Sequence, residues 1–158
     1  MENNETCGPL KLENQLCFPL YACAKEVMRL HTAWLDPLGL TFTQYITMTV
    51  LWEKEKTSVK ALGETLWLDS GTLTPLLKKL EAKGLVTRAR SRADERSVEI
   101  GLTDEGRALR DKAAGIPEKV DAFLNIPAEE AAALRSLLYK ALERIAEADA
   151  AAESASNG

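Results

Sequence analysis

The sequence has no long hydrophobic run, one histidine and three cysteines, and each scarcity excludes a class of protein. No stretch of about 18 apolar residues occurs, so no membrane-spanning helix is expected. The single histidine and the lack of a Cys-x-x-Cys pair argue against a zinc site, and no metal or cofactor is expected. Residues 1–5 (MENNE) resemble neither a signal peptide nor a transit peptide, which predicts a cytoplasmic protein.

Positive charge is concentrated in one segment of an acidic chain. The net charge is −4 over 158 residues, yet residues 76–92 carry six basic side chains and only one acidic one. A basic face on an acidic body favours a nucleic-acid partner, because local charge decides the attraction to phosphate. The alternative is that these charges belong to an ordinary solvated helix and hairpin.

Residues 68–102 predict a helix followed by a β-hairpin. Asp69 or Ser70 caps the helix, Gly84 ends it, and leucines at helical spacing form its buried stripe. Two short alternating segments then predict strands around a polar loop. This order is typical of a winged helix-turn-helix, which places a helix in the major groove and a loop beside it. The strands are expected at 86–90 and 98–100, and Thr72, Thr74, Lys78 and Lys79 lie on the helix face opposite the leucines.

The rest of the chain is predicted to be helical. Pro19 interrupts the first helical pattern and predicts a kink or a fresh helix start. Gly63 costs stability inside a helix, which a close approach of another helix would justify. The tail after Ala150 is expected to fray. Helices are expected at residues 12–38, 44–53 (capped by Thr41 or Thr43), 59–66 (capped by Thr57 and Ser58), 104–114, 119–124 and from 127 onward, with a solvated turn at 53–56.

The predicted fold class is mainly α with a small β-hairpin. A winged helix-turn-helix domain at 39–114 is expected between an N-terminal arm and dimerisation helix at 1–38 and C-terminal dimerisation helices with a frayed tail at 115–158. The terminal helices carry longer apolar stripes than a small domain needs, which predicts a homodimer; alternatively, they pack only on their own domain. A two-fold dimer would place two recognition helices about one turn of DNA apart, matching a pseudo-palindromic operator in double-stranded DNA.

Cys17 is the best candidate for a reactive cysteine. It is expected near a helix start just before Pro19, and a helix N-terminus favours a thiolate. Cys17 and Cys23 would lie about 240° apart around a helix, so they cannot form a disulfide unless the helix melts. The alternative is that these cysteines are small hydrophobic core residues.

These segments together resemble the MarR family of winged-helix repressors over about residues 11–114. LDSGTLTPLLKKLE and KGLVTRARSRADERSVEIGLT carry the resemblance, and Asp94 and Arg96 match the family's DxR pattern at the tip of the wing. We therefore expect Arg96 to enter the minor groove, oriented by Asp94. Contacts to phosphates or base edges are expected from Ser70, Thr72, Thr74, Lys78, Lys79, Arg88, Arg90 and Arg92.

Residues 12–18 (LENQLCF), with Tyr21, are similar to the organic hydroperoxide resistance regulator branch of that family. The branch implies a dimeric repressor that leaves its operator when an organic hydroperoxide oxidises an N-terminal cysteine, with which Cys17 aligns. No cysteine follows Cys23, so the resemblance points to the one-cysteine type. The sulfenic acid would be trapped by a small cellular thiol or over-oxidised, and Cys7 is another candidate partner.

The resemblance also implies a sensor pocket, in which tyrosines donate hydrogen bonds to the sensing cysteine, partly from the partner subunit. Tyr21 and Tyr45 are kept. His31 and Phe42 stand where the branch has tyrosines, and Phe42 cannot donate. His31 would lie about 20 Å from Cys17 along a straight helix, so it could act only across a dimer. The alternative for His31 is an ordinary surface histidine.

Two other functions fit parts of the sequence. One is a MarR-type repressor released by a small aromatic ligand, with Cys17 in a structural role. The other is a thiol peroxidase, but no threonine and arginine set for peroxide activation accompanies Cys17. An enzyme is therefore not expected.

Overall fold

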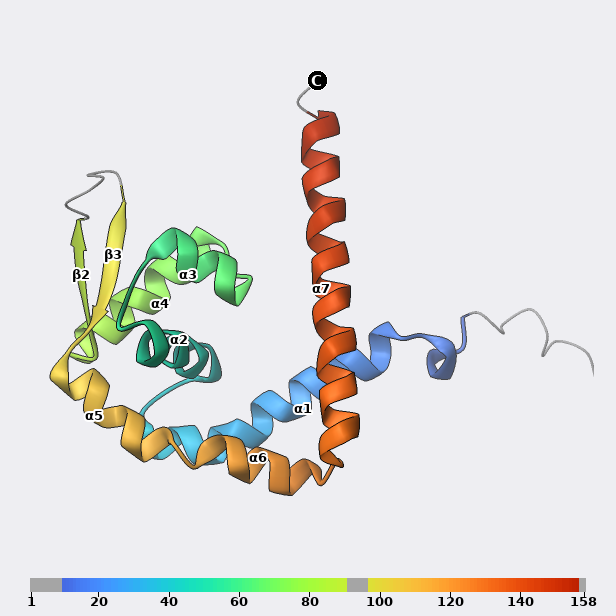
Figure 1. Ribbon diagram of the computed structural model, residues 1–158, viewed down its shortest axis with the longest axis horizontal. Helices are drawn as coiled ribbons and strands as arrows, with labels where there is room; N and C mark the ends of the chain where they lie inside the picture. Colours follow the sequence, from blue (N-terminus) through green and yellow to red (C-terminus); the bar gives the residue numbers. More distant parts are fainter. Residues whose placement is uncertain (1–9, 91–96, 157–158) are drawn as a thin grey trace, which may run out of the picture. The chain divides into compact units, whose positions relative to one another are not determined.

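The structure, a computed structural model, describes residues 10–90 and 97–156, and the chain forms two compact units, residues 1–116 and 117–158. Figure 1 colours the elements from blue to red along the chain. They are η1 (Leu12–Asn14), α1 (Cys17–Leu35), η2 (Asp36–Leu38), α2 (Phe42–Lys54), β1 (Lys56–Ser58), α3 (Val59–Leu66), α4 (Ser70–Ala82), β2 (Val86–Arg90), β3 (Val98–Leu102), α5 (Asp104–Ala113), α6 (Ile116–Leu124) and α7 (Ala128–Ser156).

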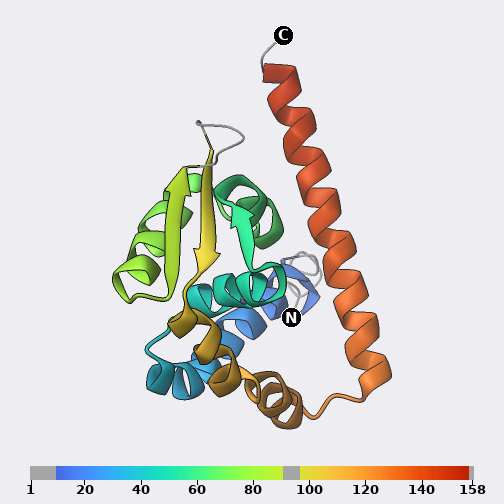
Figure 2. The same ribbon diagram turned by 60° about the vertical axis from the view of Figure 1, so that its left-hand side comes forward.

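The first unit packs α2, α3, α4 and α5 around a small antiparallel sheet. The strand order is β1–β3–β2, and Figure 2 shows β3 between its two neighbours. Each large apolar side chain that is fully buried stabilises the fold by roughly 1.5–3 kcal/mol. The buried leucines of α4 therefore anchor this helix in the core. The most deeply buried apolar side chains are Leu35, Met48, Leu51, Leu62, Leu73, Leu77, Leu80 and Ile100.

The recognition helix α4 forms as its local sequence predicts. Asp69 is the N-cap residue, and its Oδ1 accepts a hydrogen bond from the Thr72 backbone N–H at 2.9 Å. Gly84 follows the helix with φ +71°, a left-handed conformation that costs glycine nothing. The predicted stripe is buried, which confirms the helical spacing: Leu73, Leu76, Leu77 and Leu80.

Two other local predictions are confirmed. Thr41 caps α2, since its hydroxyl accepts from the Gln44 N–H while the Gln44 side chain accepts from the Thr41 N–H. A Cβ placed on Gly63 would lie 2.8 Å from the Leu68 carbonyl oxygen and 3.2 Å from Leu73 Cδ1. Gly63 therefore permits the close approach of α3 to the start of α4.

The sheet has one strand more than predicted. Lys56 was expected in a solvated turn, with Thr57 and Ser58 as helix caps, but Lys56–Ser58 forms β1 and pairs with β3 in the register Thr57 opposite Ile100. Ser58 does cap α3, accepting from the Ala61 N–H at 3.1 Å. The polar segment becomes a strand because β3 offers it a free edge, which no local pattern reveals.

Pro19 marks a fresh helix start, as one of the two expected outcomes. The chain makes one turn of 3₁₀ helix at Leu12–Asn14, and α1 then begins at Cys17. Pro19 is the third residue of α1, where its missing N–H would have had no partner within the helix.

In the second unit α7 runs to Ser156, so the expected fraying after Ala150 is wrong. Helix formers such as alanine and glutamate fill its last turns, and the Ser154 hydroxyl donates to the Ala150 carbonyl at 2.9 Å. Several large apolar side chains on α7 are exposed in the single chain, among them Leu137 and Ile145. In the described part of the chain no helix is long and apolar enough to cross a membrane.

Candidate nucleic-acid interface and redox site

The outer face of α4 presents hydroxyl and ammonium groups to solvent. Ser70, Thr72, Thr74, Lys78 and Lys79 are all exposed. The hydroxyls of Thr72 and Thr74 donate locally, to Asp69 Oδ2 at 2.8 Å and to the Ser70 carbonyl at 2.7 Å. The Thr72 side chain and backbone hydrogen bonds lower the pKa of Asp69, so the cap stays an anion that holds the first turn of the helix.

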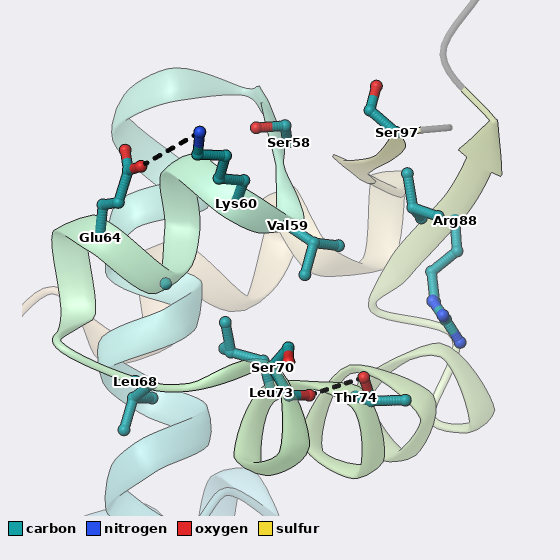
Figure 3. A pocket seen from close by; sticks show the side chains of 12 residues that line it. Ser58, Val59, Lys60, Glu64, Leu68, Ser70, Leu73, Thr74, Arg88 and Ser97 are labelled. Atoms are coloured by element: carbon teal, nitrogen blue, oxygen red, sulfur yellow. Dashed lines mark hydrogen bonds and ion pairs between the residues drawn. The ribbon is translucent and has the colours of Figure 1, made fainter. Parts of the chain in front are cut away.

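A hollow of about 620 Å³ lies between α3, α4 and the strands of the wing (Figure 3). Ser70 and Thr74 line it from α4, Lys60 from α3 and Arg88 from β2. The Arg88 guanidinium is folded back toward α4, with Nη1 3.7 Å from Glu81 Oε2, and its Nε is buried with no hydrogen-bond partner among the described residues. A phosphate contact by Arg88 would therefore require it to leave Glu81.

The remaining predicted wing residues divide between the described and undescribed parts. Arg90 ends β2 and is exposed, as a phosphate contact requires. Arg92, Asp94 and Arg96 lie outside the described residues.

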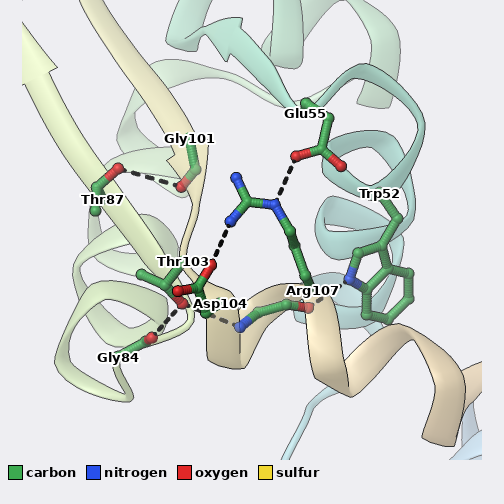
Figure 4. A network of polar contacts seen from close by, with 9 residues as sticks. Trp52, Glu55, Gly84, Thr87, Gly101, Thr103, Asp104 and Arg107 are labelled. Carbon is green, nitrogen blue, oxygen red and sulfur yellow. Dashed lines mark hydrogen bonds and ion pairs between the residues drawn. The ribbon is translucent and has the colours of Figure 1, made fainter.

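A polar network fixes the base of the wing against α2 and α5 (Figure 4). The Thr103 hydroxyl donates to the Gly84 carbonyl at 2.6 Å, and Arg107 bonds both Glu55 and Asp104 at 2.9 Å. Trp52 lies alongside, with its indole N–H directed at α5. These contacts join segments that lie far apart in the sequence, and they hold the wing in one orientation.

Cys17 is the first residue of α1, and its side chain is exposed. Tyr21 follows one turn later and is 66% exposed, so the two side chains share one face of the helix. Leu16 and Phe18 beside them are exposed as well. Cys17 is therefore not a core residue of the single chain, which counts against the structural alternative.

His31 lies in a buried aromatic cluster, so the alternative of an ordinary surface histidine is wrong. It is 6% exposed, and its ring centroid lies 4.8 Å from that of Phe42, 5.9 Å from Trp34 and 6.1 Å from Tyr45. Its Nδ1 donates to the Val27 carbonyl at 2.7 Å, because a carbonyl oxygen can only accept. The sequence analysis did not predict Trp34 as a member of this cluster, although its spacing of three residues from His31 places both side chains on one helix face.

The structure brings together part of the predicted sensor pocket. His31, Phe42 and Tyr45 meet in the cluster, whereas Cys17 and Tyr21 lie toward the other end of α1, about 20 Å and about 15 Å from His31 at the helical rise. Burial raises the pKa of Tyr45, so its hydroxyl stays protonated and able to donate. No group of metal ligands occurs among the described residues.

A capped helix with a hydroxyl and lysine face, two helices packed behind it and a β-hairpin beside it define a winged helix-turn-helix DNA-binding domain. Comparison with known proteins agrees. The profile of the family described as "Transcriptional regulator SarA/Rot" matches residues 29–113. An organic hydroperoxide resistance transcriptional regulator of Bacillus subtilis is 48% identical over 136 residues, covering 86% of this chain and 92% of that protein.

Solved structures lead to the same group. AbfR of Staphylococcus epidermidis is 31% identical with a TM-score of 0.74, covering 90% of this chain and 98% of that one. AbfR has also been solved reduced on DNA, overoxidized on DNA and with a disulfide formed. A MarR mutant from E. coli on operator DNA is 28% identical with a TM-score of 0.73, covering 80% of this chain and 93% of that one. The chain belongs to the MarR and SarA/Rot group of winged-helix transcriptional regulators, in its organic hydroperoxide resistance branch.

Proposed function

We propose that this regulator is a cytoplasmic repressor that binds double-stranded operator DNA as a homodimer and leaves it when an organic hydroperoxide oxidises Cys17. The observation that carries the proposal is the place of Cys17: an exposed sulfur in the first turn of α1, the helix whose other end enters the DNA-binding unit through η2 and α2. The described contacts of α1 with α2 and η2 support a mechanical link between the two ends.

The dimer is supported by apolar surface at both ends of the chain. Residues 1–38 and 115–158 would form the dimerisation segments on either side of the DNA-binding residues 39–114. Large apolar side chains such as Leu16 and Phe123 are exposed to solvent in the single chain, and a second copy would bury them. A second copy could also bring its own aromatic cluster to Cys17, which the length of α1 forbids within one chain.

The chemistry needs one peroxide and one thiol. The Cys17 thiolate attacks a peroxide oxygen, so an S–O bond forms, the O–O bond breaks and an alcohol leaves after protonation. A small cellular thiol then condenses with the sulfenic acid, forming a mixed disulfide and releasing water. In the relative AbfR an overoxidized form was solved on DNA. This favours the bulky mixed disulfide, rather than added oxygen alone, as the form that shifts the dimer helices.

Release by a small aromatic ligand, with Cys17 in a structural role, is not favoured. The Bacillus subtilis relative, which this chain matches over 92% of its length, is a hydroperoxide resistance regulator, and the sulfur of Cys17 is exposed rather than packed.

Mass spectrometry of the protein after cumene hydroperoxide treatment, run alongside a DNA mobility shift, tests the proposal. We expect little release while the Cys17 peptide carries only the added oxygen of the sulfenic acid, and release that rises in step with the mixed disulfide once a thiol is supplied. Release of DNA while the Cys17 peptide keeps its reduced mass would overturn the redox proposal.

Lys78 and Lys79 are expected to supply salt-dependent attraction to phosphate. Replacing either with alanine should weaken operator binding about equally for all sequences and reduce the slope of log K against log salt by about 0.9 for each phosphate that is no longer neutralised. Lys112→Ala, an exposed lysine of α5, is the matched control and should leave the slope unchanged. Equal slopes in all three variants would remove these lysines from the interface.

A further inference from the structure

One ammonium group joins the end of the recognition helix to the start of α2 and to the turn that follows α1. Lys83, the C-cap residue of α4, donates from Nζ to the Gly39 carbonyl and, at 2.9 Å, to Gln44 Oε1. These partners lie 44 and 39 residues away in the sequence. The stem of Lys83 therefore bridges the reading helix and the junction between α1 and α2.

The junction between α1 and α2, to which Lys83 is hydrogen-bonded, continues directly from the helix that carries Cys17. Leu35, the last residue of α1, leads directly into η2, whose C-cap residue is Gly39. Gln44 is 4% exposed, and its Oε1 also accepts from the Thr41 N–H at 3.2 Å. A displacement of α1 would therefore move both acceptors of the Lys83 ammonium.

The same junction carries the aromatic cluster. Phe42 follows the cap residue Thr41 in the first turn of α2 and places its ring 4.8 Å from that of His31. The cluster and the capping box thus share one turn of helix. A change at the cluster would reach Gln44 through backbone that is already hydrogen-bonded.

The hydrogen bonds of Lys83 fix the orientation of α4, which the packing of the apolar core does not determine. Leucine burial sets the depth of α4, but apolar packing has no direction of its own. Charge-assisted hydrogen bonds are directional and about twice as strong as neutral ones. Among the described residues no other side chain of α4 or its cap hydrogen-bonds the α1–α2 junction. On the other side of this end of α4, Thr103 bonds the Gly84 carbonyl and ties the turn to α5.

We infer that Lys83 is a positioning residue that couples the end of α1 to the recognition helix, so that a displacement of α1 changes the angle of α4 on DNA. The inference rests on the proposed function, because it names the path by which oxidation at Cys17 reaches the reading face. Lys83 acts through α4 and need not touch DNA.

The test compares operator affinity of the full-length protein before and after treatment with cumene hydroperoxide and a small thiol. Lys83→Met removes the charge and the hydrogen-bond donors but keeps a long side chain. Lys83→Arg keeps the charge and the donors. Lys112→Met is the control, because it removes the charge of an exposed lysine elsewhere. The wild type and Lys112→Met should share one oxidised-to-reduced ratio of Kd. Lys83→Met should lower that ratio about tenfold, within the range of couplings seen between linked sites. Lys83→Arg should restore most of it.

The readout separates coupling from simple loss of charge or fold. If Lys83 only attracted phosphate, Lys83→Met would weaken DNA binding by the reduced and the oxidised protein alike. The ratio of the two Kd values would then stay at its wild-type value, which would overturn the inference. Gln44→Glu, which keeps the cap acceptor and gives Lys83 a carboxylate, should retain the wild-type ratio, and a fall there would also overturn it. If the wild type itself is not released by peroxide, the proposed function fails. If it is released and Lys83→Met behaves identically, only the Lys83 inference fails.

Discussion

Replacing Cys17 with serine should leave the reduced affinity for operator DNA within about twofold of wild type and abolish release by organic hydroperoxide. Serine matches cysteine in size, and the side chain is exposed, so little packing changes. A hydroxyl cannot follow a thiolate along the oxidation ladder. The wild type should lose more than about a hundredfold in affinity on oxidation, which corresponds to about 3 kcal/mol. Fluorescence anisotropy of labelled operator DNA, before and after treatment with cumene hydroperoxide and a small thiol, measures both.

Cys23→Ser provides the matched control. Cys23 lies on the same helix, is also exposed and follows Cys17 by six residues, so it differs in position but not in chemistry. This variant should be released as readily as the wild type. If peroxide still released the Cys17 variant from DNA, the sensing group would lie elsewhere and the proposal for Cys17 would fail.

The aromatic cluster changes how His31 and Phe42 can take part in sensing. Their rings are already packed against each other within one chain, and the His31 Nδ1 proton is engaged by the Val27 carbonyl. Only Nε2 is left to face an incoming group, such as the sulfur of a second copy. Phe42 supplies packing but no donor, so within this proposal Tyr45 is the tyrosine of the cluster whose hydroxyl would donate to a thiolate.

The parts of the fold that the sequence predicts are those with local causes. The cap Asp69, the leucine stripe of α4 and the stop at Gly84 lie within sixteen consecutive residues, and all three form as expected. The cap of α2 at Thr41 and the fresh start near Pro19 are equally local. Caps, helical periodicity and turn residues act between neighbours, so a single sequence shows them.

The parts that the sequence does not reveal depend on distant partners. β1 is a strand only because β3 pairs with it, more than 40 residues later. The burial of His31 depends on α2 folding back over α1, and the bonds of Lys83 join residues 39 and 44 positions apart. A lysine at a helix C-terminus is expected for the dipole alone. The sequence places Lys83 at the end of the helix, but it does not show that Lys83 bonds the turn after α1.

Gly106→Ala should destabilise the protein by about 3 kcal/mol or more, a larger effect than most single substitutions. A Cβ at this position would lie 2.1 Å from the Leu85 carbonyl oxygen and 3.1 Å from Leu102 Cδ2. The first clash is with backbone, which cannot turn aside as a side chain can. The same carbonyl accepts from the Thr103 N–H at 3.2 Å, so moving it also weakens the bond between the base of the wing and α5.

The destabilisation should extend beyond the clash itself, because both backbone polar groups of Gly106 are hydrogen-bonded to other segments. Its carbonyl accepts from Trp52 Nε1 at 2.7 Å, and its N–H donates to the Thr103 hydroxyl at 3.0 Å. Any shift of α5 that relieves the clash strains both bonds and leaves a half-buried indole N–H without its acceptor. Gly115→Ala is the matched control, since a Cβ there meets nothing within 4 Å and the backbone is not left-handed. Denaturant unfolding should place Gly115→Ala within about 1 kcal/mol of wild type, and equal midpoints for the two variants would show that α5 and the wing base can separate freely.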